Sequence, residues 1–209
     1  KEILDVNKIY QKFRKKNNLS HDAFYPASRK LYFYIIGLLV VCEIIFNGFF
    51  FREVTTRGLL GGIGISVFIS LLNVLAGFYF GWLIFPYTHH IKSLYKNLSY
   101  IFTGVFSLYL LNVNFLAAHF REAVVCIRLS IRDEKLPEFC LNYNLINLDT
   151  NSLNITSIVK YMYTYPNIFN LNEVTSLALL FAGLFFAIVA IIDGYKSDDP
   201  YPNYGNIER

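Results

Sequence analysis

Four long apolar stretches constrain this chain most strongly: residues 31–51, 59–85, 98–120 and 174–192. At about 1.5 Å per residue, a helix over the first stretch covers roughly 31 Å, which matches a hydrocarbon core of about 30 Å. Backbone in lipid must satisfy its own hydrogen bonds, and the short alternating segments of a β-barrel do not occur in the sequence. We therefore expect an all-α polytopic membrane protein with four transmembrane helices in a bundle over residues 31–195.

The composition agrees with this class. Hydrophobic residues make up 55% of the 209 residues and charged residues only 16%. Soluble domains have about a quarter of their residues charged, so the balance favours lipid as the surrounding solvent.

Lys and Arg near the ends of the stretches predict the orientation. Residues 1–30 carry eight of them, whereas the loop at 52–58 has only Arg52 and Arg57. Since cytoplasmic flanks are enriched in Lys and Arg, we expect both termini inside, the segment 121–173 outside and a cytosolic tail at 196–209. The outer segment also contains cations, but long translocated segments obey this rule less closely.

The N-terminal segment 1–30 is expected to contain a basic amphipathic helix. Ile3, Val6, Ile9, Tyr10 and Phe13 recur at helical spacing, with lysines on the opposite face. Such a helix could lie on the anionic inner leaflet or lead, solvated, into the first span.

Small and polar residues follow one face of the second stretch at steps of three or four. They are Gly62, Ser66, Ser70, Asn73, Gly77 and Gly81. Small residues at this spacing let helix backbones approach closely, and Gly77-x-x-x-Gly81 has the GxxxG form. We expect this face to be a helix-packing seam.

Glu43 is the unusual residue of the first stretch, because an ionisable group in a membrane span is costly. Asn47 lies one turn further along the same face, and asparagines of the second and third stretches share its depth. The predicted polar core comprises Glu43, Asn47, Asn73, Asn112 and Asn114. Two interpretations remain open: polar contacts that hold helices together, or a hydrated path lined by Glu43.

Few residues indicate covalent or metal chemistry. Cys126 and Cys140 could form a disulfide closing a loop of about 15 residues if their compartment oxidises it. No HExxH, GxSxG or phosphate-binding glycine loop occurs, and the adjacent His89 and His90 would point apart on a helix. We expect no enzyme activity, no cofactor and no metal site.

Several short motifs resemble an uncharacterised family of four-pass bacterial membrane proteins. They are Glu43 with Asn47-Gly48, Gly58 to Gly62, Asn73, Ala118-His119 with Arg121, Asp193-Gly194-Tyr195 and the ending DDPYP-x-YG at 198–205. This chain departs from the pattern with Asn203 in place of Gly. The resemblance implies a four-helix fold, the bacterial inner membrane and a continuation into cytosolic helical segments.

Two functions compete. The first is a homo-oligomeric channel or pore-like effector gated from the cytosolic side, with anti-phage defence as a possible setting. The second is a non-conducting membrane anchor that holds a cytosolic protein assembly. Both imply contact with the lipid bilayer and a cytosolic protein partner, and neither implies nucleic acid contact by this region.

Overall fold

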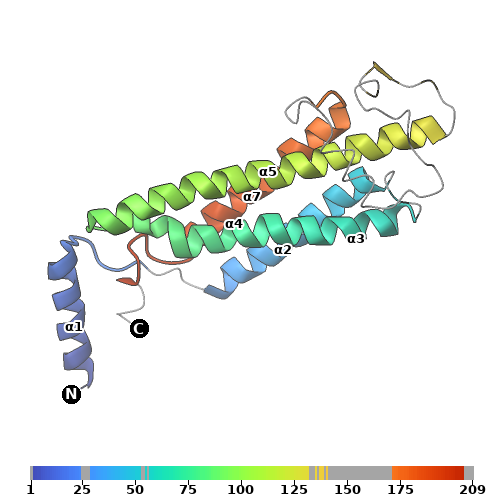
Figure 1. The fold of residues 1–209 in the computed structure, drawn as a ribbon. Helices are drawn as coiled ribbons and strands as arrows, with labels where there is room; N and C mark the ends of the chain where they lie inside the picture. The colour runs from blue at the N-terminus through green and yellow to red at the C-terminus, as the bar shows by residue number, and fades with distance from the viewer. Residues whose placement is uncertain are drawn as a thin grey trace. The chain divides into compact units, whose positions relative to one another are not determined.

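The computed structural model describes residues 2–24, 29–52, 57–131 and 171–204, and the single residues Thr55, Lys135, Pro137, Glu138 and Cys140. Within this part of the chain the fold is all helical, which confirms the predicted class (Figure 1). Four helical stretches are long and apolar enough to cross a membrane, and they pack in a bundle.

The long helices are α1 (Glu2–Asn17), α2 (Arg29–Phe51), α3 (Leu59–Ser70), α5 (Ser93–Ile131) and α7 (Val174–Lys196). Helices α2 and α7 begin and end within four residues of the predicted first and fourth spans, and α3 begins where the second span was predicted to begin. Helix α5 is longer than predicted at both ends and continues beyond residue 120 into the segment predicted to lie outside. Charged Arg121 and Glu122 do not end the helix, because both side chains are buried against neighbouring segments. Residues 141–170 of that segment lie outside the described residues.

The second span is a helix of changing pitch. After α3 it passes through a π-helical turn η1 (Leu71–Leu75), α4 (Ala76–Tyr79), a second π-helical turn η2 (Phe80–Ile84) and a 3-10 turn η3 (Phe85–His89). Pro86 stands at the start of η3, where its missing N–H and fixed φ are tolerated. π-Helical turns are rare in proteins overall, and those that do occur are often found at functional sites.

The chain divides into two compact units, each built from parts of several helices. The first comprises Lys1–Val40, Asn73–Tyr109 and Phe186–Arg209, and the second comprises Val41–Leu72 and Leu110–Phe185.

The first unit contains a close crossing of η2 and α4 with α7. A Cβ added to Gly81 would collide with the backbone carbonyl of Ile191, and one added to Gly194 would collide with the carbonyl of Phe78. A Cβ on Gly77 would lie 3.0 Å from the carbonyl oxygen of Ala187. In this unit, therefore, the predicted glycine seam packs against α7.

The second unit contains the corresponding contact between α2 and α3. A Cβ on Gly62 would lie 2.6 Å from the carbonyl oxygen of Gly48 and 2.8 Å from the backbone nitrogen of Arg52. The unit also holds a disulfide between Cys126 at the end of α5 and Cys140, with Cα atoms 5.3 Å apart.

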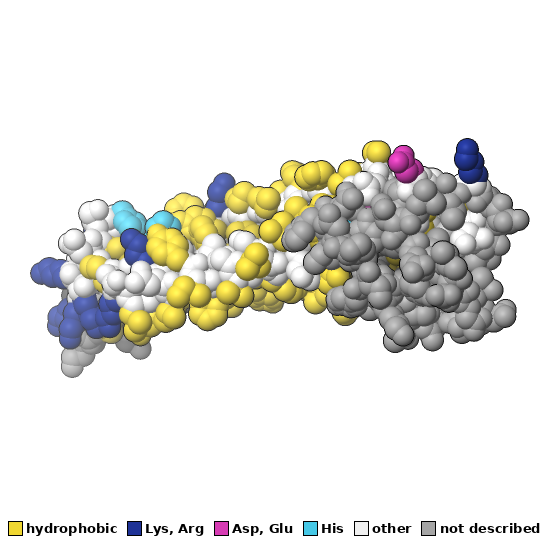
Figure 2. All heavy atoms as spheres, turned by 45° about the horizontal axis from the view of Figure 1, so that its top comes forward, with side chains coloured by type: hydrophobic (Ala, Val, Ile, Leu, Met, Phe, Trp, Pro, Cys, Tyr) yellow, Lys and Arg dark blue, Asp and Glu magenta, His cyan; other side chains and the backbone are white. Residues whose placement is uncertain are grey.

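Apolar side chains cover much of the described helical surface. Leu60 is 80% exposed and Leu108 is 68% exposed. In Figure 2 yellow hydrophobic side chains extend along the helices, whereas Lys and Arg side chains gather around α1. Apolar exposure on this scale is rare on soluble monomers and suits a lipid environment.

Candidate functional sites

The polar side chains of α2 lie inside the second unit. Glu43 is fully buried and Asn47 is 1% exposed. The antiparallel helices α2 and α3 meet where a Cβ on Gly48 would lie 3.1 Å from the Ile63 side chain. A helix rises about 1.5 Å per residue, so positions along the helix axes can be compared by counting residues from this contact. Along the axes, Asn47 lies within about 3 Å of Ser66, and Glu43 lies within about 3 Å of Ser70.

Two polar side chains of this interior donate to carbonyls of their own helices. Ser66 Oγ donates to the carbonyl of Gly62 at 2.8 Å, and Asn114 Nδ2 donates to the carbonyl of Leu110 at 2.9 Å. Each of these bonds stays within one helix. Asn47 Oδ1 and Ser70 Oγ, both buried, have no hydrogen-bond partner among the described residues.

The remaining asparagines occupy different places. Asn73 is fully buried in η1 and belongs to the first unit. Asn114 is 2% exposed in the second unit, whereas Asn112 is exposed. Residues two positions apart on a helix point about 200° apart, so Asn112 and Asn114 cannot both face inward. Asn112 therefore lies outside the buried polar set.

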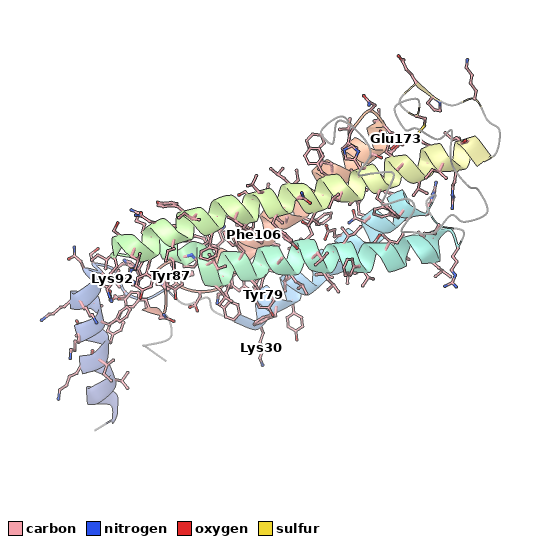
Figure 3. The ribbon with its side chains drawn as sticks, viewed as in Figure 1. Lys30, Tyr79, Tyr87, Lys92, Phe106 and Glu173 are labelled. Carbon is pink, nitrogen blue, oxygen red and sulfur yellow. A yellow bond between two sulfur atoms is a disulfide. The ribbon has the colours of Figure 1, made fainter. Side chains whose placement is uncertain are left out.

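A buried arginine joins three elements of the second unit. Arg121 is 2% exposed, and its Nε donates to the carbonyl of Phe50 at 3.0 Å. Its Nη1 forms an ion pair with the Glu173 carboxylate and donates to Ser176 Oγ at 3.2 Å. Burial alone would raise the pKa of Glu173, but hydrogen bonds from Arg121 and Ser176 and the Arg121 charge lower it overall. Figure 3 labels Glu173 just before the start of α7.

Glu122 anchors the same end of α7 through backbone groups. Its Oε2 accepts the N–H groups of Asn172 and Glu173 at 3.2 and 3.1 Å. These N–H groups lie just before the helix, where donors are often left unsatisfied. The sequence analysis did not identify Glu173, although a buried Arg requires a carboxylate partner.

The first unit joins the two ends of the chain. Tyr204 is fully buried; its hydroxyl donates to the carbonyl of His21 at 2.7 Å and lies 3.0 Å from the Tyr10 hydroxyl. The ring of Tyr204 stacks on Tyr10 and on Phe13, with centroids 5.5 and 5.8 Å away. The apolar face of α1 is thus covered by the tail at Tyr10 and Phe13. We call this contact between α1, residues 18–24 and residues 199–204 the terminal junction.

Polar contacts explain the DDPYP ending. Asp199 accepts the N–H of Phe24 at 2.6 Å and the N–H of Tyr201 at 2.7 Å, and the Tyr201 hydroxyl donates to Asn17 Oδ1 at 2.9 Å. Asn203 has φ of 63°, a left-handed conformation that favours Gly and that Asn adopts more readily than most residues. Asn is therefore well suited to this position.

Histidine and aromatic side chains gather where the second span ends in the first unit. His89 Nε2 lies 3.2 Å from the Tyr195 hydroxyl, and His90 stacks on Tyr87 and on Tyr201. Burial and the nearby Lys92 lower the pKa of His90, which favours its neutral form (Tyr87 and Lys92 are labelled in Figure 3). Aromatic rings at the end of a span are typical of a membrane interface. No group of three or more His, Cys, Asp or Glu side chains that could hold a metal occurs among the described residues.

Comparison of the chain with protein-family models, curated proteins and solved structures finds no match.

Proposed function

We propose that this chain is a membrane channel whose conducting path follows the buried polar side chains of its second unit. The observation that carries the proposal is the pair of buried oxygens, Asn47 Oδ1 and Ser70 Oγ, that have no hydrogen-bond partner among the described residues. Leaving such a group unsatisfied costs about 1–3 kcal/mol, and proteins usually satisfy buried polar groups with internal water. Water at this level would lie beside the buried carboxyl group of Glu43.

The hydroxyl of Ser66 also favours a hydrated path. Polar residues that hold helices together donate across the helix interface, whereas Ser66 donates to the carbonyl of Gly62 in its own helix. Water is the natural partner for the unsatisfied oxygens of Asn47 and Ser70.

The terminal junction offers a means of gating. It ties α1 to the segment that directly follows α7, through Tyr204, Tyr201 and Asp199. A cytosolic protein that binds the exposed lysine face of α1 would act on the end of α7 through this contact. The proposed channel is a homo-oligomer in the bacterial inner membrane, with both termini cytoplasmic and no cofactor.

Conductance in reconstituted planar bilayers tests the channel. Wild-type protein should carry current, and Glu43→Gln should assemble normally but change ion selectivity or the dependence of current on pH between 5 and 8. Ser107→Ala is the control, because Ser107 is exposed and its hydroxyl bonds to Thr103 of its own helix. Unchanged currents in Glu43→Gln would refute a path beside Glu43.

A non-conducting membrane anchor is the second candidate. The ion pair of Arg121 and the terminal junction both fasten helix ends, which a scaffold for a cytosolic assembly requires. Folded wild-type protein that carries no current under any voltage or pH would favour this anchor.

A further inference from the structure

Two rows of polar side chains face each other across α2 and α3 in the second unit. The contact at Gly62 fixes their register, because a Cβ there would lie 2.9 Å from the carbonyl carbon of Phe51. Residues four positions apart share one face of a helix, so each further turn along these antiparallel helices pairs one residue of α2 with one of α3. The next two pairs, which we call the polar ladder, are Asn47 with Ser66 and Glu43 with Ser70.

The polar ladder presents oxygen atoms to the interior of the unit. All four of its side chains are at most 1% exposed. Asn47 Oδ1 and Ser70 Oγ have no hydrogen-bond partner among the described residues. Ser66 Oγ donates to the carbonyl of Gly62 and keeps its lone pairs as acceptors, and the Glu43 carboxyl adds two more oxygens. Acceptor oxygens gathered around one negative side chain attract a cation and repel an anion.

We infer that the polar ladder binds an alkali-metal cation, so that the proposed channel is selective for cations. The two pairs lie about 6 Å apart along the helix axes, so a cation midway between them would lie about 3 Å along the axis from each pair. Oxygen atoms of Asn47, Ser66 and Ser70 would then replace part of its hydration shell, as backbone carbonyls do in potassium channels. Cation selectivity rests on the proposed channel, whereas cation binding does not.

The charge of the polar ladder favours a monovalent ion over a divalent one. Sites for Ca²⁺ combine many oxygen ligands, several of them carboxylates, and Mg²⁺ gives up its water reluctantly. The part of the chain that the structure describes holds no group of three or more His, Cys, Asp or Glu side chains that could bind a metal. In the polar ladder Glu43 supplies the one acidic side chain, which balances a single positive charge.

Thermal unfolding of the full chain in detergent micelles tests the cation directly. Wild-type protein is compared in NaCl, KCl, CaCl₂ and N-methyl-D-glucamine chloride at equal ionic strength, so that screening of surface charges is the same. A ligand that binds only the folded state raises the unfolding temperature as its concentration increases. NaCl or KCl should therefore raise the unfolding temperature, whereas the bulky N-methyl-D-glucamine cation should not. A larger rise in CaCl₂ would overturn the assignment to a monovalent ion.

Two substitutions test whether the polar ladder is the site. Ser70→Ala and Asn47→Leu should each raise the dissociation constant of the cation by about tenfold, because each removes an oxygen ligand. Ser99→Ala is the matched control: Ser99 is also buried, but in the first unit, where its hydroxyl donates to the carbonyl of Ile84 at 3.0 Å. It should keep the wild-type dissociation constant. In N-methyl-D-glucamine chloride the order reverses, since Ser99→Ala loses a hydrogen bond and Ser70→Ala loses none among the described residues.

The results distinguish the cation site from the channel. Equal unfolding temperatures of wild type in all four salts would overturn the inference and leave water alone in the polar ladder. Equal dissociation constants for wild type, Ser70→Ala and Asn47→Leu would also overturn it. Cation binding that these variants weaken, in a protein that carries no current in planar bilayers, would keep the site and refute the channel. A current that reverses at the chloride potential in a KCl gradient would keep the channel and refute its cation selectivity.

Discussion

Arg121 connects three helices of the second unit through a single guanidinium group. It belongs to α5, forms an ion pair with Glu173 just before α7, and donates to the carbonyl of Phe50 in the last turn of α2. Arg suits this place because its planar fork presents several donors that remain charged at any physiological pH. A Lys here could not bond in these directions at once.

The ion pair predicts loss of stability in acid. The pKa of Glu173 is held below its ordinary value of 4.5, so the ion pair stabilises the folded state above about pH 4.5, and this contribution is lost as the pH falls through the folded-state pKa. Thermal unfolding of detergent-purified protein between pH 7 and pH 3.5 should show this loss in wild type. Glu173→Leu should be less stable at pH 7 by roughly 3 kcal/mol, because it leaves a buried charge unpaired. A Glu173→Leu protein as stable as wild type at neutral pH would contradict this role.

Where the second span crosses α7 in the first unit, each of the two helices places a glycine against a backbone carbonyl of the other. Gly81 lies against the carbonyl of Ile191, and Gly194 lies against the carbonyl of Phe78. A backbone carbonyl cannot rotate away as a flexible side chain can. Even a methyl group at either glycine therefore forces the two helices apart.

Alanine substitutions test this crossing. Gly81→Ala and Gly194→Ala should each destabilise the protein by about 1–3 kcal/mol, the usual cost of overpacking. Gly37→Ala is the control, since a Cβ there meets nothing within 4 Å, and Ala has the higher helix propensity. The difference in stability is measured as the unfolding midpoint when a harsh detergent is titrated into protein in a mild one. Equal midpoints for Gly81→Ala and Gly37→Ala would contradict the proposed close packing at Gly81.

The terminal junction is expected to hold α1 in place. Tyr204→Ala should release α1 by removing the fully buried ring that stacks on Tyr10 and Phe13. Backbone amides of α1 should then exchange hydrogen at least tenfold faster, while those of α5 keep their protection. Tyr34→Ala serves as control because Tyr34 is 75% exposed. Unchanged exchange in α1 would show that the junction does not hold the helix.

The charges and the disulfide both support the proposed orientation in the membrane. Basic residues gather on α1, which favours the cytoplasmic side. The Cys126–Cys140 disulfide favours an oxidising compartment, because reducing systems keep cytosolic thiols free. Both features favour the proposed topology, with Cys126 and Cys140 outside.

Cysteine labelling in intact cells checks that topology. In a Cys42→Ala background, an impermeant maleimide should label Lys135→Cys and should not label Lys12→Cys until the membrane is opened. Both positions are exposed, so access depends on the side of the membrane. The reverse pattern of labelling would invert the proposed orientation and place the terminal junction outside.

Hydropathy and length were sufficient to locate the four spans, because these properties are local and lipid imposes one backbone solution. Helical spacing also identified the glycine face, but only the tertiary structure shows that Gly81 meets Ile191 of α7. The sequence predicts both Asn112 and Asn114 in the polar core, but only Asn114 is buried, because neighbouring helices set the rotation of α5 about its axis. Likewise Tyr204 and Tyr10 are 194 residues apart, and Arg121 and Glu173 are 52 apart. Such contacts depend on how separate helices pack, and a single sequence records the local preferences of each helix without recording its partners.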